Sequence, residues 1–569
     1  MIICGLKLTH DGAVALIDGD RLVFSVEMEK IDNGKRYTWI SDLTIIPRIF
    51  ADFGYKPEDV DEWVIDGWDG DQPKPLFFAM HDNGKPIEIT VAPYRECPAC
   101  PDLLQPGYSD EFTIDGHTYP YTSYTHAAGH LSSTYCTSPF AQRGEPAFVL
   151  IWDGGLFPAL YLVDPDTGVR NLGDLFPLLG HAYAIAGQHF GPFQRPDAAN
   201  AWDLTVAGKL MAYVALGAPR DPVLAVLRDE FHRIFESDQD QAVEYRRRTG
   251  GFGSPFEPSV PPVHEFYTAV RTRTEPAEVS DEDVLASIHQ FFEDLLCERI
   301  TGALRAADAA GPVNLCFTGG CALNIKWNSA LRALPAVREM WVPPFPNDSG
   351  SAIGAAALGR IAHAGLSAVD WSTRLGPELL PVRNIPAGWW ARPCPPAELA
   401  RVLHETGDPV VVLNGRAELG PRALGGRSIL AAPTGPGMKD ELNRIKAREP
   451  YRPVAPICLV DAAPEIFDPG VPDPYMLFDH AVRPAWADRI PAVVHLDGTA
   501  RLQTVDPADD PVLGEVLVEY HRLSGIPVLC NTSANLNGRG FFPDVASAIA
   551  WGRVGRVWSA GTLYQRRGA

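Results

Sequence analysis

The sequence predicts an α/β protein with at least two domains. Its 569 residues exceed what one hydrophobic core usually organises, and 46% hydrophobic with 21% charged residues is the composition of a globular protein. Short β-prone runs, such as 147–152 and 313–317, alternate with the helical spacing of 281–309. A Pro-rich, weakly periodic segment at about 365–395 separates two such regions. We therefore expect domains over 1–370 and 390–569.

The N-terminal residues predict three strands joined by two tight turns. Apolar runs at 2–9 and 13–17 are broken by Thr9-His10-Asp11-Gly12, and 21–27 is again β-prone. This order resembles the opening of the actin-like ATPase fold, where a hairpin turn meets a nucleotide. His10 would then face a cleft, although Asp11 and Gly12 alone fit an ordinary hairpin corner.

Residues 68–120 are rich in Pro, Gly and Asp, and we expect a long loop or insertion with short strands there. It contains Cys97 and Cys100, which have the spacing of half a zinc site or of a redox motif. No second CxxC pair accompanies them, so two ordinary thiols are the favoured interpretation. The other cysteines are scattered and several lie in apolar runs, which is typical of buried thiols in a reducing compartment.

Three segments suggest a metal site. His126 and His130 are four residues apart, so both side chains leave the same face of a helix. Asp348 stands at the start of a small-residue helix and is a third candidate ligand, although it also fits a helix N-cap. The strand 147–152 ends in Asp153-Gly154, where the chain can turn under a phosphate or a metal-bound water. Without further context, the two histidines would be taken as ordinary helix residues.

Three other segments suggest anion binding. The strand 313–317 ends in Thr318-Gly319-Gly320 before a helix, which directs backbone N–H groups toward an anion. The stretch Gly415–Pro456 has eight basic and four acidic residues on a Gly- and Pro-bent backbone, and guanidinium groups suit phosphate and carboxylate. The strand 526–530 runs into the polar residues 531–535. A basic surface patch is the alternative for the arginine stretch.

The overall charge limits the partners. Forty-nine basic and seventy-one acidic residues give a net charge of −22, so neither nucleic acid nor an anionic membrane is an expected partner. The sequence has no signal-peptide pattern and no run long enough to cross a bilayer. We expect a cytoplasmic protein.

An ordered set of motifs carries a family resemblance. The chain is similar to the ATP-dependent O-carbamoyltransferases of the nodulation and antibiotic-tailoring family, and its start is similar to the branch that acts on hydroxymethylcephem intermediates. The matching motifs span nearly the whole chain and are GLKLTHDGAVALIDG, THAAGH, DGG, GKLMAYVALG, FTGGCALN, PNDSGSAIGAA, GRAELGPRALGGRSIL, NRIKAREPYRPVAP, PYMLF, HLDGTARLQTV and GIPVLCNTSAN.

The resemblance implies a fold and a reaction. It implies a TsaD-like, actin-like domain followed by a YrdC-like α/β domain. The second domain would activate carbamoyl phosphate with Mg²⁺-bound ATP to carbamoyl adenylate. The first would transfer the carbamoyl group to a hydroxyl, expected to be a hydroxymethyl group of a small natural product. It would hold Fe²⁺ or another divalent metal.

The resemblance also implies roles for individual residues. His126, His130 and Asp348 match the metal ligands, with Asp153 and Gly154 beside them, and His10 matches a histidine that assists the acceptor hydroxyl. Gly319, Gly320 and Asn324 match the nucleotide-side loop. The carbamoyl phosphate and ATP pocket is matched by Arg422, Lys446, Arg452, Arg501 and Asn531. Two departures from the usual motifs are Gly426 in place of Asn and Ala534 in place of Phe.

Other functions fit the sequence less well. A threonylcarbamoyl-type tRNA-modifying enzyme shares both domain types, but the charge of −22 opposes a tRNA substrate. A hydroxymethylated nucleoside or base is another possible acceptor. A non-catalytic nucleotide-binding regulator would not need so many Arg, Lys, His and Asp residues at turns.

Overall fold

The computed structural model describes residues 1–68, 70, 72–82, 85–98, 100–194, 204–236, 261–309 and 311–568. Its contacts divide the chain into two units. The first comprises residues 1–9, 13–23 and 40–371, and the second comprises 10–12, 24–39 and 372–569. The second unit therefore includes N-terminal residues that the expected continuous domains, 1–370 and 390–569, did not assign to it.

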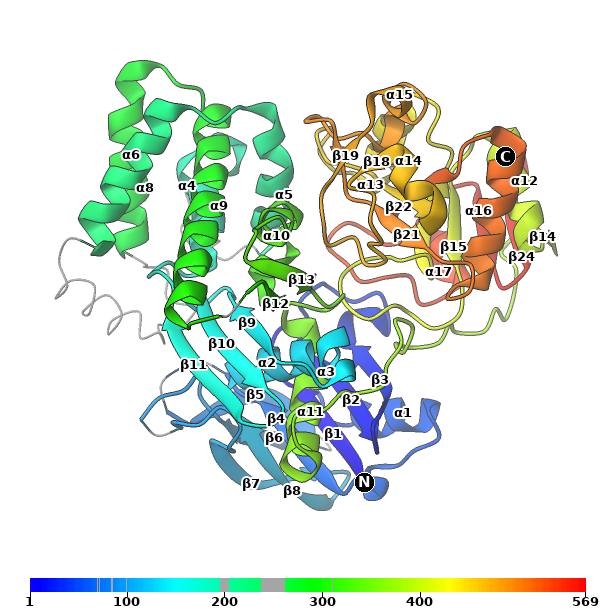
Figure 1. Ribbon diagram of the computed structural model, residues 1–569. Helices are drawn as coiled ribbons and strands as arrows, with labels where there is room; N and C mark the ends of the chain where they lie inside the picture. Colours follow the sequence, from blue (N-terminus) through cyan, green and yellow to red (C-terminus); the bar gives the residue numbers. More distant parts are fainter. Residues whose placement is uncertain are drawn as a thin grey trace. The chain divides into compact units, whose positions relative to one another are not determined.

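The first unit contains a six-stranded sheet (Figure 1). Its order is β3 (Arg21–Glu27), β2 (Ala13–Asp18), β1 (Ile2–Lys7), β4 (Glu62–Asp66), β8 (His117–Tyr124), β7 (Tyr108–Ile114). The three predicted N-terminal strands are confirmed. Strands β1 and β4 are parallel and pair Leu6 with Ile65, so their charged last residues, Lys7 and Asp66, end at the same edge of the sheet.

The second sheet of this unit has five strands. They are β11 (Gly168–Asp174), β10 (Ala159–Asp164), β9 (Ala147–Ile151), β12 (Val313–Thr318) and β13 (Val337–Trp341), in that order. Helix α11 (Ser351–Ala364) contacts the first sheet, helix α2 (His126–Cys136) contacts the second, and the two helices pack on each other. Small residues make this possible, because a Cβ at Gly354 would lie 1.9 Å from the carbonyl oxygen of Gly129.

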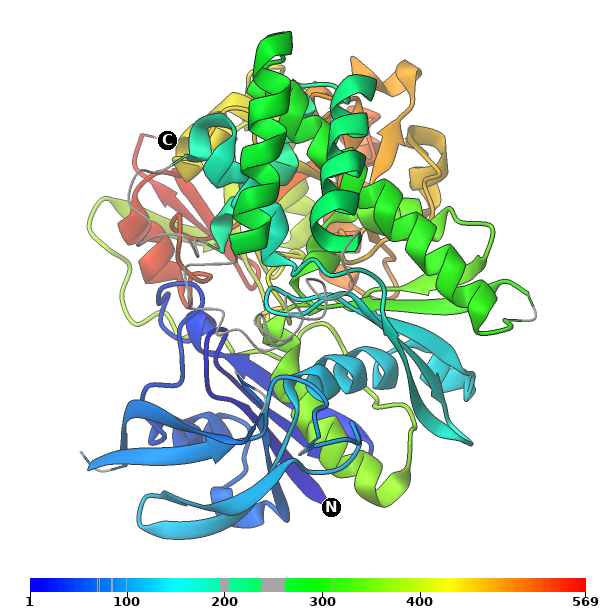
Figure 2. The same cartoon turned by 90° about the vertical axis from the view of Figure 1, so that its left-hand side faces the viewer.

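Most remaining helices of the unit gather in one group, seen in Figures 1 and 2. They are α4 (His181–His189), α5 (Thr205–Tyr213), α6 (Asp221–Phe231), α8 (Pro261–Thr274) and α9 (Asp281–Ala306). Shorter helices are α1 (Ile45–Asp52), α3 (Pro139–Arg143) and α10 (Ile325–Arg332). The helical spacing of residues 281–309 is thus confirmed as a long helix that ends at Ala306.

Residues 68–120 contain more strand than the predicted loop. Besides β7, they form the two-stranded sheet of β5 (Lys74–Asp82) and β6 (Lys85–Val91). Residues 69, 71, 83, 84 and 99 lie outside the described part. The hairpin of β7 and β8 turns at Asp115 and Gly116, which have φ of 49° and 81°. Two left-handed residues match the twist of a hairpin, a signal that the sequence carried as Asp-Gly.

The second unit is built on an eight-stranded sheet. Its order is β14 (Trp389–Pro393), β24 (Thr562–Arg566), β23 (Arg556–Ser559), β15 (Val410–Leu413), β16 (Arg427–Ala431), β22 (Val528–Ser533), β17 (Ala455–Leu459), β21 (Gln503–Val505). A small sheet joins β18 (Phe467–Asp468), β19 (His480–Val482) and β20 (Thr499–Ala500). The helices are α12 (Pro396–Thr406), α13 (Met438–Lys446), α14 (Ala463–Ile466), α15 (Pro484–Ala487), α16 (Pro511–Ser524) and α17 (Val545–Trp551). One apolar core, which includes Val412, Ile457 and Leu529, fills the unit.

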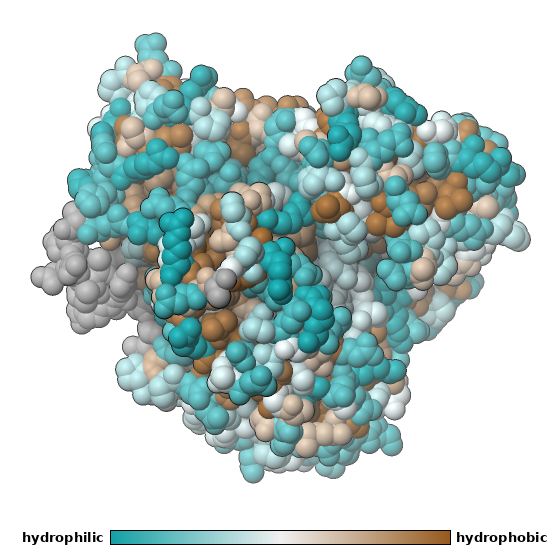
Figure 3. Space-filling view, in the orientation of Figure 1, coloured by the Kyte–Doolittle hydropathy of each residue, from teal (hydrophilic) through white to brown (hydrophobic). Residues whose placement is uncertain are grey.

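The face of the molecule in Figure 3 mixes hydrophilic residues with small hydrophobic patches. Among the described residues, no helix combines the length and the apolar character that a membrane span requires.

Candidate active site

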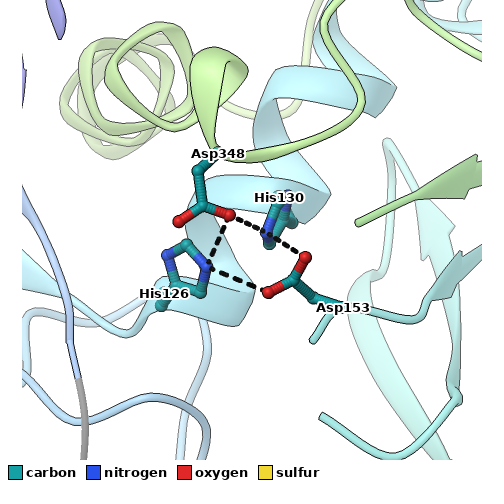
Figure 4. A group of neighbouring side chains, drawn as sticks. All are labelled: His126, His130, Asp153 and Asp348. Carbon is teal, nitrogen blue, oxygen red and sulfur yellow. Dashed lines mark ion pairs between the residues drawn. The ribbon is translucent and has the colours of Figure 1, made fainter. Parts of the chain in front are cut away.

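Four buried side chains of the first unit converge on one point (Figure 4). His126 and His130 leave the same face of α2, and the carboxyl groups of Asp153 and Asp348 lie opposite them. The Nε2 atoms of His126 and His130 are 3.5 and 3.6 Å from Asp348 Oδ1. One ligand atom from each of the four residues lies within 4.8 Å of all the others. The structure therefore brings together the three predicted metal ligands and Asp153.

The orientation of the histidines fits a metal site. His126 Nδ1 lies 2.7 Å from Asp66 Oδ2, so this carboxylate orients the ring and favours a proton on Nδ1. The Nε2 atoms of both histidines are buried and have no hydrogen-bond partner among the described residues. Two imidazole nitrogens with two carboxylates suit a divalent transition metal such as iron or zinc. Such an ion would act as a Lewis acid toward a bound oxygen.

Asp153 is fixed by two hydrogen bonds. The hydroxyl of Tyr94 donates to Oδ2 at 2.7 Å, and the backbone N–H of Gly320 donates to Oδ1 at 2.7 Å. Burial and the neighbouring Asp348 would raise the pKa of Asp153, but His126 and His130 outweigh them and lower it. The residue is therefore held as a carboxylate that can serve as a ligand.

Asp348 is not the N-cap of α11. It begins the short turn 348–350, and the N-cap position of α11 is Gly350. The Asp348 Oδ2 atom instead lies 2.9 Å from Lys7 Nζ. This salt bridge and the two histidines engage both carboxylate oxygens, so the ligand interpretation is favoured over the cap.

Lys7 and Asp66 belong to this centre, and sequence reasoning missed both. Lys7 is 1% exposed, and its ammonium lies 2.9 Å from Asp66 Oδ2. Burial lowers the pKa of Lys7, but attraction to Asp348 and Asp66 outweighs it and raises that pKa. The available signal was a charged residue at the end of each apolar strand, β1 and β4.

The predicted glycine turn after β12 has a steric reason. Gly319 has φ of 90°, and a Cβ there would lie 2.3 Å from the carbonyl oxygen of Trp152. Gly154 also lies close to a neighbour, since a Cβ there would lie 2.7 Å from the ring of His181. Asn324 caps α10, accepting from the backbone N–H groups of Lys326 and Trp327. A nucleotide role for these residues stays a prediction.

The second unit gathers five basic side chains. Burial, followed by repulsion from neighbouring arginines, lowers the pKa of Arg448 to about 9 and that of Arg501 to about 10. The pKa values of Arg422 and Arg452 are lowered as well, and Arg501 and Arg452 act on Arg422. We call Arg422, Lys446, Arg448, Arg452 and Arg501 the arginine cluster. Its mutual repulsion favours a bound anion.

Protein oxygens already occupy the ammonium group of Lys446. It donates to the backbone oxygens of Ser533 at 2.7 Å and Asn535 at 2.6 Å, and also to Asn535 Oδ1. This arrangement fixes the turn that follows Asn531. The predicted catalytic role of Lys446 remains untested, and its contacts favour positioning of that turn.

Asn531 presents an oriented acceptor. Its Nδ2 donates to the carbonyl oxygen of Ala423 at 3.0 Å and to Gln503 Oε1 at 2.7 Å. Gln503 is itself oriented, because its Nε2 donates to Leu424 O at 3.0 Å. Asn531 Oδ1 is therefore the remaining amide atom, and it is buried with no hydrogen-bond partner among the described residues. The Nε donor of Arg501 is likewise buried with no hydrogen-bond partner among the described residues.

Asn531 lies within β22, which continues to Ser533, so the predicted polar turn starts later than expected.

Some side chains of the arginine stretch bond to its own backbone and are not available to a ligand. Arg427 is 2% exposed and donates to the carbonyl oxygens of Asn414, Gly415 and Gly426. The buried carboxylate of Glu418 accepts from the N–H groups of Gly426 and Arg427. A Cβ at Gly426 would lie 3.1 Å from this carboxylate, which accounts for glycine where the resemblance expects Asn. These two side chains build the loop.

Residues 24–39 also support the arginine stretch. Lys30 donates to the carbonyl oxygens of Glu418 and Gly420 at 2.5 and 2.7 Å, and Gly420 N–H donates to Glu27. Arg36 N–H donates to Gly538 O at 3.1 Å, and the Arg36 guanidinium repels Arg422. An N-terminal segment therefore helps to shape the arginine cluster.

His10 and Asp11 belong to the second unit. Its Nδ1 is 2.9 Å from Asp11 Oδ2, and Asp11 has φ of 56°. The pair has the geometry of a histidine oriented by a carboxylate. Its expected role toward an acceptor remains a prediction.

Cys97 and Cys100 face each other across a tight backbone bridge. In the described part of the chain, His126, His130, Asp153 and Asp348 form the only group with three or more potential metal ligands, so the zinc alternative for the cysteines gains no support. Burial, with Cys97 next in importance, raises the pKa of Cys100 to about 11, as expected for an unreactive thiol. Cys530 is also fully buried with a raised pKa.

Fold and site together define an α/β protein with a buried His/Asp centre that could hold a metal ion in one unit and a cluster of basic side chains in the other. The family model described as "Carbamoyltransferase N-terminus" matches residues 2–94 and 112–357. The model described as "Carbamoyltransferase C-terminus" matches residues 400–554. The chain belongs to the carbamoyltransferase family. Within the expected insertion at 68–120, only 95–111 falls outside the first match.

Individual relatives span the whole chain. Nodulation protein U of Rhizobium tropici is 52% identical over 100% of this chain and 96% of its own length. The 3'-hydroxymethylcephem-O-carbamoyltransferase of Streptomyces clavuligerus is 30% identical over 100% of this chain and 99% of its own. The resemblance to the cephem branch is therefore that of a more distant relative.

A solved structure, component A of the (R)-2-hydroxyglutaryl-CoA dehydratase of Acidaminococcus fermentans, covers 64% of this chain and 99% of its own at 12% identity and a TM-score of 0.31. At that score the match adds nothing to the family assignment.

Proposed function

We propose that this protein is an ATP-dependent O-carbamoyltransferase that uses carbamoyl phosphate and a small-molecule alcohol. Water would hydrolyse carbamoyl phosphate to carbamate and phosphate, and the carbamate oxygen would then attack the α-phosphate of ATP to give carbamoyl adenylate and pyrophosphate. The acceptor hydroxyl would then attack the carbamoyl carbon, giving the carbamate ester and AMP. The acceptor is expected to be a hydroxymethyl group of a small natural product.

The observation that carries this proposal is the pairing of the arginine cluster with the oriented acceptor of Asn531. Guanidinium groups suit the phosphate oxygens of carbamoyl phosphate and would neutralise charge on the departing phosphate. Carbamoyl phosphate also has an amide NH₂, which needs an acceptor. Asn531 Oδ1 supplies one, on a side chain that donates to the carbonyl oxygen of Ala423, the residue after Arg422.

The metal centre supports the transfer half of the proposal. His126, His130, Asp153 and Asp348 would hold a divalent ion, which supplies Lewis-acid polarisation when bound. The expected arrangement of a TsaD-like and a YrdC-like domain belongs to this proposal, as do Mg²⁺-bound ATP and the nucleotide role of Gly319, Gly320 and Asn324. His10, oriented by Asp11, is proposed to accept the proton of the acceptor hydroxyl.

A product assay tests the proposal. The protein is incubated with carbamoyl phosphate, ATP and Mg²⁺, with Fe²⁺, Mn²⁺ or Zn²⁺ added, and release of phosphate, pyrophosphate and AMP is measured with a panel of alcohols. Pyrophosphate that depends on carbamoyl phosphate is expected. Absence of both pyrophosphate and AMP under every metal condition would refute the proposal. Formation of carbamoylated nucleoside or tRNA would instead favour the alternative acceptors.

The role of His10 has its own test. His10→Ala should retain pyrophosphate release and lose transfer to the alcohol, because the imidazole acts only on the acceptor proton. Both half-reactions are measured on the same preparation. An equal fall in the two rates would show that His10 is not the acceptor base.

A further inference from the structure

Lys7 occupies an unusual place for a buried ammonium group. It is 1% exposed and lies 2.9 Å from an oxygen of each of two carboxylates, Asp66 and Asp348, and 3.3 Å from His126 Nδ1. The Trp68 ring covers it, with 4.6 Å from Nζ to the ring centroid. A fully buried lysine carries a large desolvation cost unless carboxylates surround it, as they do here.

Asp348 connects Lys7 to the metal centre. Its Oδ1 faces the Nε2 atoms of His126 and His130, whereas its Oδ2 contacts Lys7. The carboxylate thus bridges the candidate ion site and the ammonium group. In two-metal sites the ions lie about 3.5–4 Å apart and often share such a carboxylate. Lys7 contacts Asp348 Oδ2, the oxygen that a second, carboxylate-bridged ion would need.

The net charge of the metal centre also fits a single divalent ion. Asp66, Asp153 and Asp348 contribute three negative charges and Lys7 one positive charge, which leaves two negative charges when the histidines are neutral. One divalent ion neutralises them. A trivalent ion, or a second divalent ion, would leave an uncompensated positive charge in a buried site, which is unfavourable.

We propose that Lys7 is a positioning residue that acts as a permanent second cation, holds Asp348 to one ligand oxygen and restricts the centre to a single divalent ion. The inference rests on the metal centre and is independent of carbamoyl transfer. Its tests measure metal binding without substrates, so they can fail or succeed whatever the reaction is.

The wild-type protein provides the first test. Mn²⁺ is titrated into metal-free protein by calorimetry, and the bound Mn²⁺ is then examined by electron paramagnetic resonance. One Mn²⁺ per chain with the spectrum of an isolated ion is expected. Two ions per chain, a spin-coupled pair, or no binding would overturn the proposal.

Iron provides a further test on the wild-type protein. Iron loaded anaerobically as Fe²⁺ should be retained on gel filtration and largely lost after oxidation with ferricyanide. Equal retention of Fe³⁺ would contradict the selection of divalent ions.

A variant provides the second test. The Lys7→Met substitution keeps the approximate length of the side chain and removes its charge. The variant protein should therefore bind Mn²⁺ at least tenfold more tightly than the wild type or take up a second ion. Lys30→Met is the matched control, because Lys30 is a buried lysine of the second unit, and its Mn²⁺ affinity should equal that of the wild type. If folded Lys7→Met binds one Mn²⁺ with unchanged or weaker affinity, Lys7 is only a structural salt-bridge partner. The wild-type measurements decide the question if this variant does not fold.

Discussion

The metal centre of the first unit and the arginine cluster of the second hold buried charge in opposite ways. In the metal centre, Lys7 is compensated by Asp66 and Asp348 at 2.9 Å, and the excess is negative. In the arginine cluster, like charges adjoin one another, and burial with their repulsion lowers the pKa values of Arg422, Arg448 and Arg501. The comparison shows that each unit of the chain leaves one sign of charge in excess, negative in the first unit and positive in the second.

The largest expected effect tests the anion side of this comparison. Arg452→Ala should lower kcat/KM for carbamoyl phosphate by about 10²–10³-fold, since a half-buried donor to developing charge is lost. Release of phosphate and pyrophosphate is the measurement. Arg444→Ala is the control, because Arg444 lies in the same stretch with a side chain that is 72% exposed, and it should behave as wild type. Phosphate release retained in Arg452→Ala would refute its role.

The next effect tests the cation side. Asp66→Asn should weaken Mn²⁺ binding about 10–100-fold, because Asp66 orients His126 through Nδ1 without being a ligand itself. Calorimetric titration measures this affinity. Asp52→Asn, an exposed carboxylate at the end of α1, should leave it unchanged. Equal Mn²⁺ affinities in the two variants would show that orientation of His126 by Asp66 does not affect metal binding.

A smaller effect sharpens the description of the arginine cluster. Gln503→Met should raise KM for carbamoyl phosphate about tenfold and reduce its preference over acetyl phosphate, since the Asn531 amide loses the bond that orients it. Acetyl phosphate replaces the NH₂ with a methyl group and so reports on the Asn531 acceptor. The exposed Gln142→Met serves as control. An unchanged preference would show that Asn531 Oδ1 does not contact the NH₂ group.

The smallest effect needs no variant. Pyrophosphate at about five times its dissociation constant should stabilise the protein by about 1 kcal/mol and raise the midpoint of thermal unfolding, because it binds only the folded cluster. Scanning calorimetry with sodium chloride at equal ionic strength as control measures this shift. The shift should shrink in Arg452→Ala, and a shift that persists there would place the bound anion elsewhere.

Local sequence signals were sufficient for much of the fold and for part of the site. The three N-terminal strands, the long helix of residues 281–309 and the placement of His126 and His130 on one helix face followed from periodicity. The loop with short strands expected at 68–120 contains two hairpins. They were not foreseen, because Pro and Gly in that segment masked the alternation of apolar and polar residues in β7 and β8. Lys7 and Asp66 were missed, because nothing local relates two residues 59 positions apart.

The sequence by itself determined which residue types are available: two histidines at helical spacing, an arginine-rich stretch in an acidic chain, and glycines at the turns. Only the tertiary structure decided which of these side chains bind a ligand and which hold the protein together. Burial lowers the pKa values of both Arg427 and Arg452, which stand in the same stretch. Arg427 nevertheless donates to backbone oxygens of its own loop, whereas Arg452 repels Arg422, Arg448 and Arg501. Packing makes this distinction, because desolvation and neighbouring charge depend on contacts between segments far apart in the chain.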